Sequence, residues 1–233
     1  HMLKFLHKKT HTKNLVLSGG SFMNSVFNGK AHKATLFNNV WVSSCPADDG
    51  LSIGAALYLY NNILKKKTRY ELKHNFFGPS YSTNKIKEDL IKYKVKFKYE
   101  KNISQIVSKE LAKGKLIGWF QGSMEFGQRA LGNRSILADP RSKNSKTKVN
   151  QAVKYRENFR PFAPAVIDKY AHQYFELAKG EKVPFMEKVV KVKKEKINII
   201  PAVVHKDFSA RVQTVDHVTN KVFYNLINEF YKE

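Results

Sequence analysis

LIGWFQGSMEFGQRALGNRSILADPR, residues 116–141, carries the clearest structural pattern in this chain. It opens with a β-type apolar run, Leu116 to Phe120, turns through three glycines, and closes with a second apolar run, Ser135 to Ala138. Arg129 and Arg134 lie between the two runs. Glycine lets a ligand approach the backbone closely, and arginine presents a planar fork of donors that fits phosphate or carboxylate. The pattern predicts a strand–turn–strand unit whose arginines either bind an anion or are solvated on a surface hairpin, and the residues alone leave both open.

The composition is that of a globular protein. The chain has 233 residues, of which 42% are hydrophobic and 26% charged, enough for one large domain or two small ones. It contains no run of about 18 apolar residues, so we expect no transmembrane helix. The first two residues resemble a cloning scar with no secretory leader behind it. A single cysteine, Cys45, cannot form an internal disulfide, and we therefore expect a cytoplasmic protein.

The net charge of +23 is large enough to suggest a polyanionic partner. The lysines are, however, spread along the whole chain, and the sequence is also rich in asparagine, isoleucine and phenylalanine. A biased genome produces the same mixture, so a specific nucleic-acid role is not the favoured interpretation. The charge should still attract anions such as ATP at low salt.

The N-terminal part predicts a phosphate-contacting unit. A strand over residues 14–17 runs into the turn 18–21, Ser-Gly-Gly-Ser, and helical spacing follows from 22 to 33. A helix N-terminus after such a turn offers backbone N–H groups and partial positive charge to a phosphate, although many structural turns have the same sequence. Residues 1–13 are polar and basic, and we expect a frayed end there.

The sequence of residues 40–64 predicts a second unit in the N-terminal part, with a strand over 40–43, a turn over 45–50 and a helix over 51–64. The helix is apolar on most faces, which predicts burial. Asp48 and Asp49 lie at its N-terminal end. One of them either caps the helix, a contact worth about 0.5–2 kcal/mol, or directs a carboxylate at a metal or nucleotide.

The polar, basic segment that follows contains Gly-Pro-Ser and predicts a domain boundary. Beyond it, apolar periodicity predicts mixed helices and strands. The expected helices are 86–93, 103–111, 142–153 and 220–231, and the expected strands are 95–99, 161–167, 183–193, 197–205 and 210–215.

Lys154, Arg156 and Arg160 form a basic cluster in KYRENFRPFAP, residues 154–164. Such a cluster is usually a solvated turn, but its aromatic residues could also stack on RNA. No RNA-recognition or zinc signature accompanies it.

Three motifs in order, GWFQGSMEFGQRALGNRSILADPR, KYRENFRPFAP and ARVQTVD, resemble the O-carbamoyltransferases of the NodU/CmcH type. FFGPSYS, VPFM, LVLSGGSFMNSVFNGK and ADDGLSIGAAL are similar to further family features, so the resemblance covers nearly the whole chain. Family members combine an ATPase module of the actin/sugar-kinase (ASKHA) type, like the tRNA threonylcarbamoylation protein, with a YrdC-like module.

The resemblance implies an α/β (α+β) chain with a YrdC-like mixed-sheet domain behind a partial ASKHA segment. The implied divisions are a tag scar and flexible N-terminus over 1–13, the end of the ATPase-like module over 14–66, a linker over 67–84, and the YrdC-like domain over 85–233. About half of the first module, with a metal-binding His pair, is expected before residue 14, and a short terminal segment after residue 233.

The implied function is that of an ATP-dependent carbamoyltransferase. The YrdC-like module converts carbamoyl phosphate and ATP into carbamoyl-adenylate, with release of phosphate and pyrophosphate. The first module then transfers the carbamoyl group to an alcohol of a sugar or antibiotic-like acceptor, with help from a metal ion, expected to be iron. We expect this shortened chain to be inactive alone and to hold the metal weakly or not at all.

The resemblance also implies site residues. The positions that bind carbamoyl phosphate and the adenylate match Arg129, Lys154, Arg160 and Arg211, with Arg134, Ser135 and Arg156 as their neighbours and His205 and Asp207 as pocket-lining residues. The loop near the nucleotide phosphates matches Ser18, Gly19, Gly20 and Asn24. The metal ligand matches Asp49. Ion pairs of Arg134 and Arg156 with Glu125 or Glu157 are an equally open interpretation. His205 could serve as a general acid, by its position alone.

Two other classes of function stay open. One is an RNA-binding module of YrdC-like fold, because such folds carry basic clefts. The other is a non-catalytic remnant that serves as an interaction surface. No residue points to a particular acceptor alcohol or to an oligomeric state.

Overall fold

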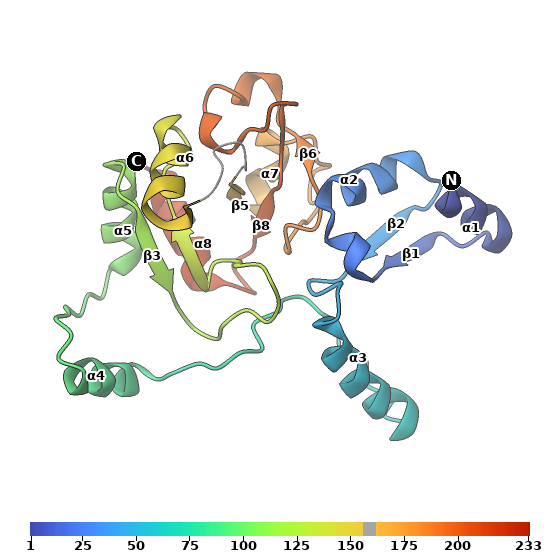
Figure 1. Cartoon of the computed structure of the whole chain (residues 1–233), viewed down its shortest axis with the longest axis horizontal. Helices are drawn as coiled ribbons and strands as arrows, with labels where there is room; N and C mark the ends of the chain where they lie inside the picture. Colours follow the sequence, from blue (N-terminus) through green and yellow to red (C-terminus); the bar gives the residue numbers. More distant parts are fainter. Residues whose placement is uncertain (156–161) are drawn as a thin grey trace.

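The computed structural model describes residues 1–155 and 162–233. Figure 1 shows an N-terminal part built around β1 and β2 and a larger C-terminal part that contains the remaining strands. The α-helices are α1 Met2–Thr10, α2 Ser25–Ala34, α3 Gly50–Tyr58, α4 Thr83–Lys92, α5 Ile103–Ala112, α6 Asn144–Val149, α7 Asp168–Tyr174 and α8 Lys221–Phe230. The strands are β1 Asn14–Leu17, β2 Asn39–Val42, β3 Ile117–Phe120, β4 Arg134–Leu137, β5 Ala165–Ile167, β6 Val190–Lys191, β7 Ser209–Ala210 and β8 Gln213–Val215. Shorter helical turns are η1 Gly20–Met23, η2 Leu59–Ile63, η3 Asn150–Lys154, η4 Lys194–Lys196 and η5 Pro201–Val203.

The N-terminal part is organised by the parallel pair β1–β2, in which Leu15 lies opposite Val40. Its core is a small apolar cluster that includes Leu17 and Phe37. The predicted strands and the helix after the Ser-Gly-Gly turn are confirmed. The expected frayed N-terminus is wrong: α1 is a helix, and the ring of His7 lies edge-on to Phe37 with centroids 5.0 Å apart.

The burial predicted for the apolar helix after residue 50 is wrong for this chain. Helix α3 and the π-helical turn η2 form where the pattern predicted a helix, but neither contains a buried residue. Leu51 is 70% exposed and Ile63 is 59% exposed. The pair projects away from both parts, and no other element of the described residues covers it (Figure 1). Apolar residues on several faces indicate that a helix is buried, but burial requires other elements that pack against those faces.

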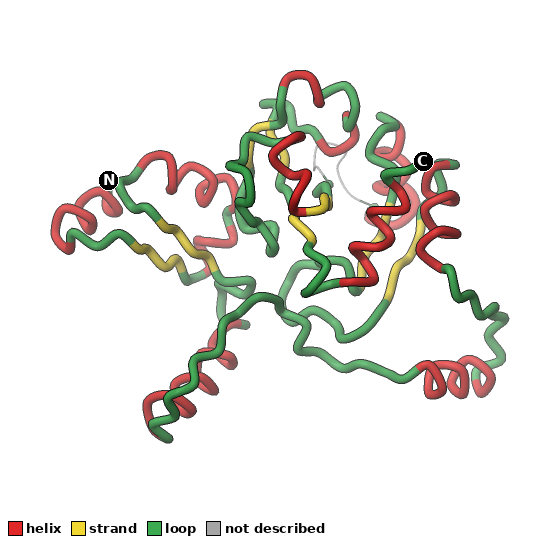
Figure 2. Tube along the Cα trace, turned by 180° about the vertical axis from the view of Figure 1, so that it is seen from behind, coloured by secondary structure: helices red, strands yellow, loops and turns green. Residues whose placement is uncertain are grey.

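A long connector joins the two parts. Residues 65–82 form no helix or strand, and α4 follows at a distance from the body of the molecule (Figure 2). The strand predicted over residues 95–99 is wrong, because this segment pairs with no strand and Val95, Phe97 and Tyr99 are exposed. Alternation alone does not make a strand when no neighbouring strand accepts its hydrogen bonds.

The hairpin predicted from residues 116–141 is confirmed. Strands β3 and β4 pair in antiparallel register, with Trp119 opposite Ser135. Helices α5 and α8 pack beside the hairpin in one apolar cluster, to which Leu111, Phe223 and Leu226 contribute. The predicted helices α5, α6 and α8 form close to their expected limits.

A second apolar cluster holds the rest of the C-terminal part, with Phe175, Val183 and Val212 at its centre. Strands β5 and β8 pair in parallel, and β6 and β7 pair antiparallel. The long strands predicted over 183–193 and 197–205 are wrong: β6 has two residues, and the second segment forms helical turns. Pro201, which lacks an N–H group, starts η5 and cannot donate to a sheet. The mixed α/β class is confirmed, with small two-stranded sheets.

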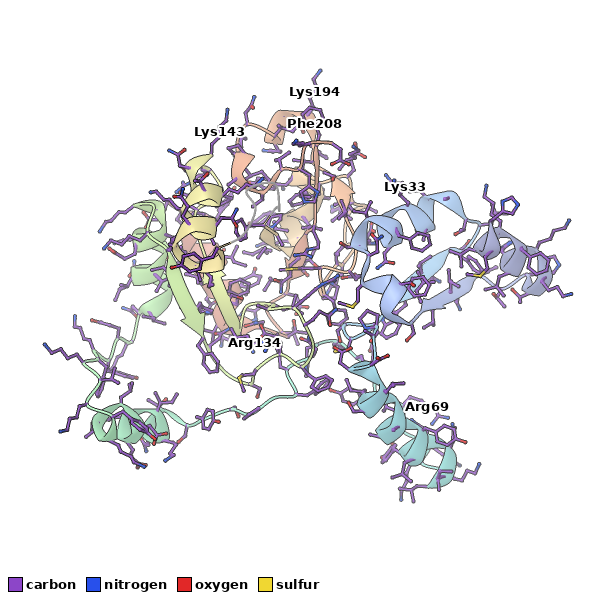
Figure 3. All side chains as sticks on the ribbon, in the orientation of Figure 1. Lys33, Arg69, Arg134, Lys143, Lys194 and Phe208 are labelled. Carbon is purple, nitrogen blue, oxygen red and sulfur yellow. The ribbon has the colours of Figure 1, made fainter. Side chains whose placement is uncertain are left out.

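Cationic side chains are spread over separate elements. Figure 3 labels Lys33 on α2, Arg69 in the connector, Lys143 just before α6 and Lys194 in η4, and these four side chains lie in different regions of the surface. The net charge therefore does not gather into one basic face at these positions.

The two parts meet where α2 lies against residues 187–189. The N–H of Val189 donates to Ser25 O at 2.9 Å, and Asn28 Nδ2 donates to Glu187 O at 2.8 Å. Gly29 follows Asn28 on α2, and a Cβ atom there would be 2.1 Å from Val189 O.

We expect Gly29→Ala to lower the free energy of unfolding by about 1–3 kcal/mol, because a backbone oxygen cannot yield as a side chain can. Gly54→Ala in α3 is the matched control, since nothing lies within 4 Å of its added Cβ and alanine favours a helix by about 1 kcal/mol. Urea unfolding followed by far-UV circular dichroism measures both variants. Equal effects of the two substitutions would contradict the close contact at Gly29.

Candidate functional site

The loop between β3 and β4 is organised by one buried carboxylate. Glu125 has no exposed side-chain surface. Its Oε1 accepts hydrogen bonds from Leu131 N at 2.6 Å and Asn133 N at 2.8 Å, and its Oε2 lies 3.2 Å from Arg134 Nε. A buried acid that accepts from two backbone amides and forms an ion pair with one arginine ties three points of the loop together.

A network of side-chain amides attaches the same loop to helix α8. Gln121 Nε2 donates to Asn133 Oδ1 at 3.0 Å and to Asn220 Oδ1 at 2.8 Å, and Asn220 Nδ2 donates to Asn133 Oδ1 at 2.8 Å. Asn220 also caps α8 through Phe223 N. Gly132 has a φ of 106°, in the region that favours glycine. These hydrogen bonds join the loop to the start of α8 through buried polar groups.

A cavity of about 600 Å³ lies beside this loop, with walls from β4, α5, α6, α8 and residues 162–165 and 202–213. Arg129, Arg134 and Arg211 line it, as does Ser135, so these four predicted site residues meet around one space. Lys146 of α6 adds a fourth cation. The rest of the wall is largely apolar: Leu111, Val149, Phe162, Phe223 and Leu226 are among its members. The cavity thus combines several cations with apolar walls.

Arg129 lies at the contact between the two parts of the chain. Its Nη1 donates to Phe185 O at 2.9 Å and Met186 O at 2.6 Å, and its Nη2 donates to Met23 O at 3.0 Å. Burial, together with the nearby charge of Arg211, lowers the pKa of Arg129 to about 10. The guanidinium is therefore still charged at neutral pH, and it holds the N-terminal part against the cavity wall.

Arg134 forms the ion pair that was one of its two open interpretations. In addition to its contact with Glu125, its Nη2 donates to Gly127 O at 2.5 Å. Figure 3 shows this side chain beside the hairpin loop. Ser135 Oγ accepts a hydrogen bond from Gly132 N at 3.0 Å. Both residues therefore hold the loop while they line the cavity.

His205 belongs to a short polar chain next to the cavity and is not part of its wall. Ser209 Oγ donates to Asp207 Oδ1 at 2.6 Å and lies 3.1 Å from His205 Nδ1. Because the carboxylate accepts the hydroxyl proton, Oγ is the acceptor for an Nδ1–H group. Burial and the charges of Arg211 and Lys146 lower the pKa of His205, against the effect of Asp207, and favour the neutral imidazole.

The predicted phosphate loop lies in the N-terminal part. Gly19 N donates to Pro46 O at 2.6 Å, and Ser18 Oγ donates to the same oxygen at 3.5 Å. Asn24 caps α2, since its Oδ1 accepts from Phe27 N at 3.1 Å, and Gly20 opens η1. None of the four predicted loop residues lines the cavity, so the sequence predictions fall in two separate regions.

Asp49 caps α3 by accepting from Gly50 N at 3.1 Å, so the capping interpretation is confirmed. Within residues 1–155 and 162–233, no group of three His, Cys, Asp or Glu side chains could hold a metal ion. One carboxylate supplies too few ligands for a transition metal, which usually needs at least three from the protein. The described residues do not fit a metal centre by themselves.

The basic cluster of the sequence lies mostly outside the described residues. Lys154 ends η3, and Arg156 and Arg160 belong to residues 156–161, which the structure does not describe. The chain resumes at Phe162, in the cavity wall.

Sequence reasoning missed three residues of this region. Lys146 belongs to a helix that looked merely polar, and Glu125 was considered only as an ion-pair partner. Gln213 lines the cavity two residues after Arg211, and its Nε2 donates to Leu131 O at 2.8 Å. Alternation in ARVQTVD could have indicated it, because residues two apart in an extended segment share a face.

Comparison with known proteins identifies the family. The model described as Carbamoyltransferase C-terminus matches residues 108–233, and the Carbamoyltransferase N-terminus model matches residues 1–57. This chain belongs to the carbamoyltransferase family.

Curated relatives match along nearly the whole chain. The nodulation protein NolNO of Sinorhizobium fredii is 38% identical over 236 residues, which cover 100% of this chain and 35% of that protein. NolO of Bradyrhizobium diazoefficiens is 38% identical over 100% of this chain, and the match covers 43% of NolO. Nodulation protein U of S. fredii is 32% identical over 97% of this chain, and the match covers 38% of that protein. The chain thus spans about two fifths of the length of these relatives. Among its described helices, none has the length and apolarity that a membrane span requires.

Proposed function

We propose that this carbamoyltransferase chain supplies the carbamoyl-activating site of an ATP-dependent O-carbamoyltransferase. The C-terminal, YrdC-like part would form carbamoyl-adenylate from carbamoyl phosphate and ATP, for transfer to a hydroxyl group of a sugar or antibiotic-like acceptor. The observation that supports this most is that Arg129, Arg134, Lys146 and Arg211 line one shared cavity.

The chemistry needs such a cavity because both reactants are anions. Cations fixed before the reactants arrive offset their repulsion and stabilise charge on the leaving pyrophosphate. The apolar wall suits the adenosine part of ATP, and about 600 Å³ lies within the range of roughly 300–1,000 Å³ that small-molecule pockets occupy. Lys154, Arg156 and Arg160 stay candidates for the same task through the family resemblance.

The proposed reaction proceeds in three balanced steps. Water cleaves carbamoyl phosphate to carbamate and phosphate, and a carbamate oxygen then attacks the α-phosphorus of ATP, with pyrophosphate as the leaving group. Afterwards the acceptor hydroxyl attacks the carbamoyl carbon, loses its proton, and AMP leaves. The lowered pKa of His205 favours the neutral imidazole, and the charge of Arg211 is close enough to contribute to that shift, so His205 is a candidate for positioning that cation.

The transfer step is proposed for the N-terminal part. Ser18, Gly19, Gly20 and Asn24 would lie near the nucleotide phosphates there. Asp49 would bind a metal, proposed to be iron, only together with ligands that the described residues do not supply.

The test is carbamoyl phosphate-dependent exchange of labelled pyrophosphate into ATP. We expect Arg129→Ala and Arg211→Ala each to lower the exchange rate about 10²–10³-fold, the usual loss when one preorganised donor to a developing charge is removed. Lys143→Ala, an exposed cation outside the cavity wall, is the control and should leave the rate unchanged. Far-UV circular dichroism checks the fold of each variant, because Arg129 also joins the two parts.

The same substitutions are made at the corresponding positions of a full-length relative such as NolO, since this chain spans 43% of it. Exchange that does not require carbamoyl phosphate, or that is unchanged in both arginine variants of the relative, would exclude the proposed site.

A further inference from the structure

The side chains that line the cavity are rich in hydrogen-bond donors. Arg129, Arg134, Lys146 and Arg211 carry donors only. A carbamoyl group differs from phosphate in this respect, because it has a carbonyl oxygen that accepts and an amino group that donates two hydrogen bonds. Cations can bind its oxygen but cannot satisfy its N–H groups, so recognition of the amino group requires an acceptor in the wall.

Two of the acceptors in the wall are already engaged. Both carboxylate oxygens of Asp139 accept from Arg141, Oδ1 from Nε at 3.0 Å and Oδ2 from Nη2 at 2.8 Å. Ser135 Oγ accepts from Gly132 N. Of the two glutamines in the wall, Gln128 is exposed to solvent, whereas Gln213 is only 5% exposed.

Gln213 is held so that its oxygen is available. Its backbone N–H donates to Pro164 O at 2.9 Å, and the residue lies opposite Ala165 in the β5–β8 pair. Its Nε2 donates to Leu131 O at 2.8 Å, which fixes the orientation of the amide. Within residues 1–155 and 162–233, no donor reaches Oε1 of Gln213. Gln213 Oε1 is not one of the buried polar atoms closed off from solvent, so water or a ligand in the cavity can donate to it.

Gln213 is also close in sequence to a cation of the same wall. Arg211 precedes it by two residues, and both line the cavity. Arg211 offers donors to an oxygen, and Gln213 offers an acceptor to an N–H group. Such a pair matches the two sides of a carbamoyl group.

We propose that Gln213 is the specificity-determining residue of the cavity, whose Oε1 accepts a hydrogen bond from the amino group of the carbamoyl substrate. This inference rests on the proposed function. It explains how a cationic site selects a carbamoyl group over an acyl group of the same size, which has a methyl group in place of the amino group.

Two hydrolysis-stable probes test the proposal, phosphonoacetamide and 2-oxopropylphosphonate, which differ only by an amino against a methyl group. Isothermal titration calorimetry gives their affinities for the full chain. We expect the wild type to bind phosphonoacetamide about three- to tenfold more tightly, the usual contribution of one neutral hydrogen bond. Gln213→Met keeps the length of the side chain but removes the acceptor, and should bring this ratio to about one while the affinity for the methyl ketone stays the same.

Thr214→Val is the matched control on the same strand. Thr214 is buried outside the cavity wall, where its Oγ1 accepts from Val183 N at 2.8 Å. We expect Thr214→Val to leave the ratio of the two affinities unchanged, because a loosened strand weakens the binding of both probes by the same factor. A changed ratio in this variant would therefore overturn the assignment to Gln213.

The outcomes separate this inference from the proposed function. If neither probe nor carbamoyl phosphate binds the wild type, the proposed function fails, and the inference fails with it. If the wild type binds both probes equally, or Gln213→Met keeps the preference, the inference is overturned while the anion site stands. Should Gln213→Met not fold, the ¹⁵N side-chain amide signal of Gln213 in the wild type decides. It should shift with phosphonoacetamide more than with the ketone, and equal shifts would overturn the inference.

Discussion

Glu125→Ala is expected to lower the free energy of unfolding by about 3 kcal/mol or more. The substitution removes the acceptor of two backbone amides, Leu131 N and Asn133 N, and the carboxylate that faces Arg134. Each buried donor left without a partner costs about 1–3 kcal/mol, whereas the arginine is 38% exposed and recovers part of its loss in water. Urea unfolding monitored by tryptophan fluorescence gives the difference, because Trp119 is buried in the adjacent strand.

Two further substitutions make this result specific. Glu125→Gln keeps an oxygen for the two amides but places an NH₂ group against Arg134, so we expect a loss smaller than that of the alanine variant. Glu110→Ala is the control, since its carboxylate pairs with Lys113 and Lys115 at the surface, and we expect no measurable change. A Glu125→Ala variant as stable as Glu110→Ala would show that the loop does not depend on the buried carboxylate.

The hairpin was predictable because its information is local. Two apolar runs, separated by glycines, form a strand–turn–strand unit from residues close in sequence, and β3 and β4 lie where the pattern indicated. Helices α5 and α8 were predictable for the same reason, since the spacing of their apolar residues is that of one buried face.

Two of the failed predictions depended on a partner that no local pattern contains. Helix α3 is apolar enough for a core, but burial requires a second surface. Residues 95–99 alternate like a strand, but a strand needs a neighbour to accept its hydrogen bonds. In both cases the apolar pattern is present in the sequence, but the burial or pairing that it predicts requires a neighbouring element that is absent from the described residues.

The candidate site shows the same division. The grouping of Arg129, Arg134 and Arg211 was expected from the family motifs, whereas the local pattern around Arg129 and Arg134 left an anion site and a solvated hairpin both open. The contact of Gln213 with Leu131 joins residues 82 positions apart, and no spacing in the sequence indicates it. Long-range contacts of this kind decide which polar atoms stay available to a ligand.

Gly132→Ala is expected to destabilise the chain by about 3–5 kcal/mol. The φ of Gly132 is 106°, which L-residues rarely adopt, and an added Cβ would lie 2.3 Å from Cδ1 of Phe223. Phe223 is 3% exposed and packs with Leu111 and Leu226, so its ring cannot move away without opening the core. Gly118→Ala in β3 is the control, because nothing lies within 4 Å of its added Cβ and its backbone is unstrained. Urea unfolding of both variants measures the difference, and similar stabilities would contradict the tight packing at Gly132.

The same substitution links stability to the site. Gly132 N donates to Ser135 Oγ, and Gly132 O accepts from Gln121 Nε2 at 3.1 Å, so a shifted backbone changes both contacts. Ser135 lines the cavity, and the network of Gln121 holds the loop that carries Arg129. We therefore expect Gly132→Ala to weaken the binding of phosphonoacetamide and of 2-oxopropylphosphonate by similar factors. A common loss for both probes indicates a displaced wall, whereas Gln213→Met affects only the probe that carries an amino group.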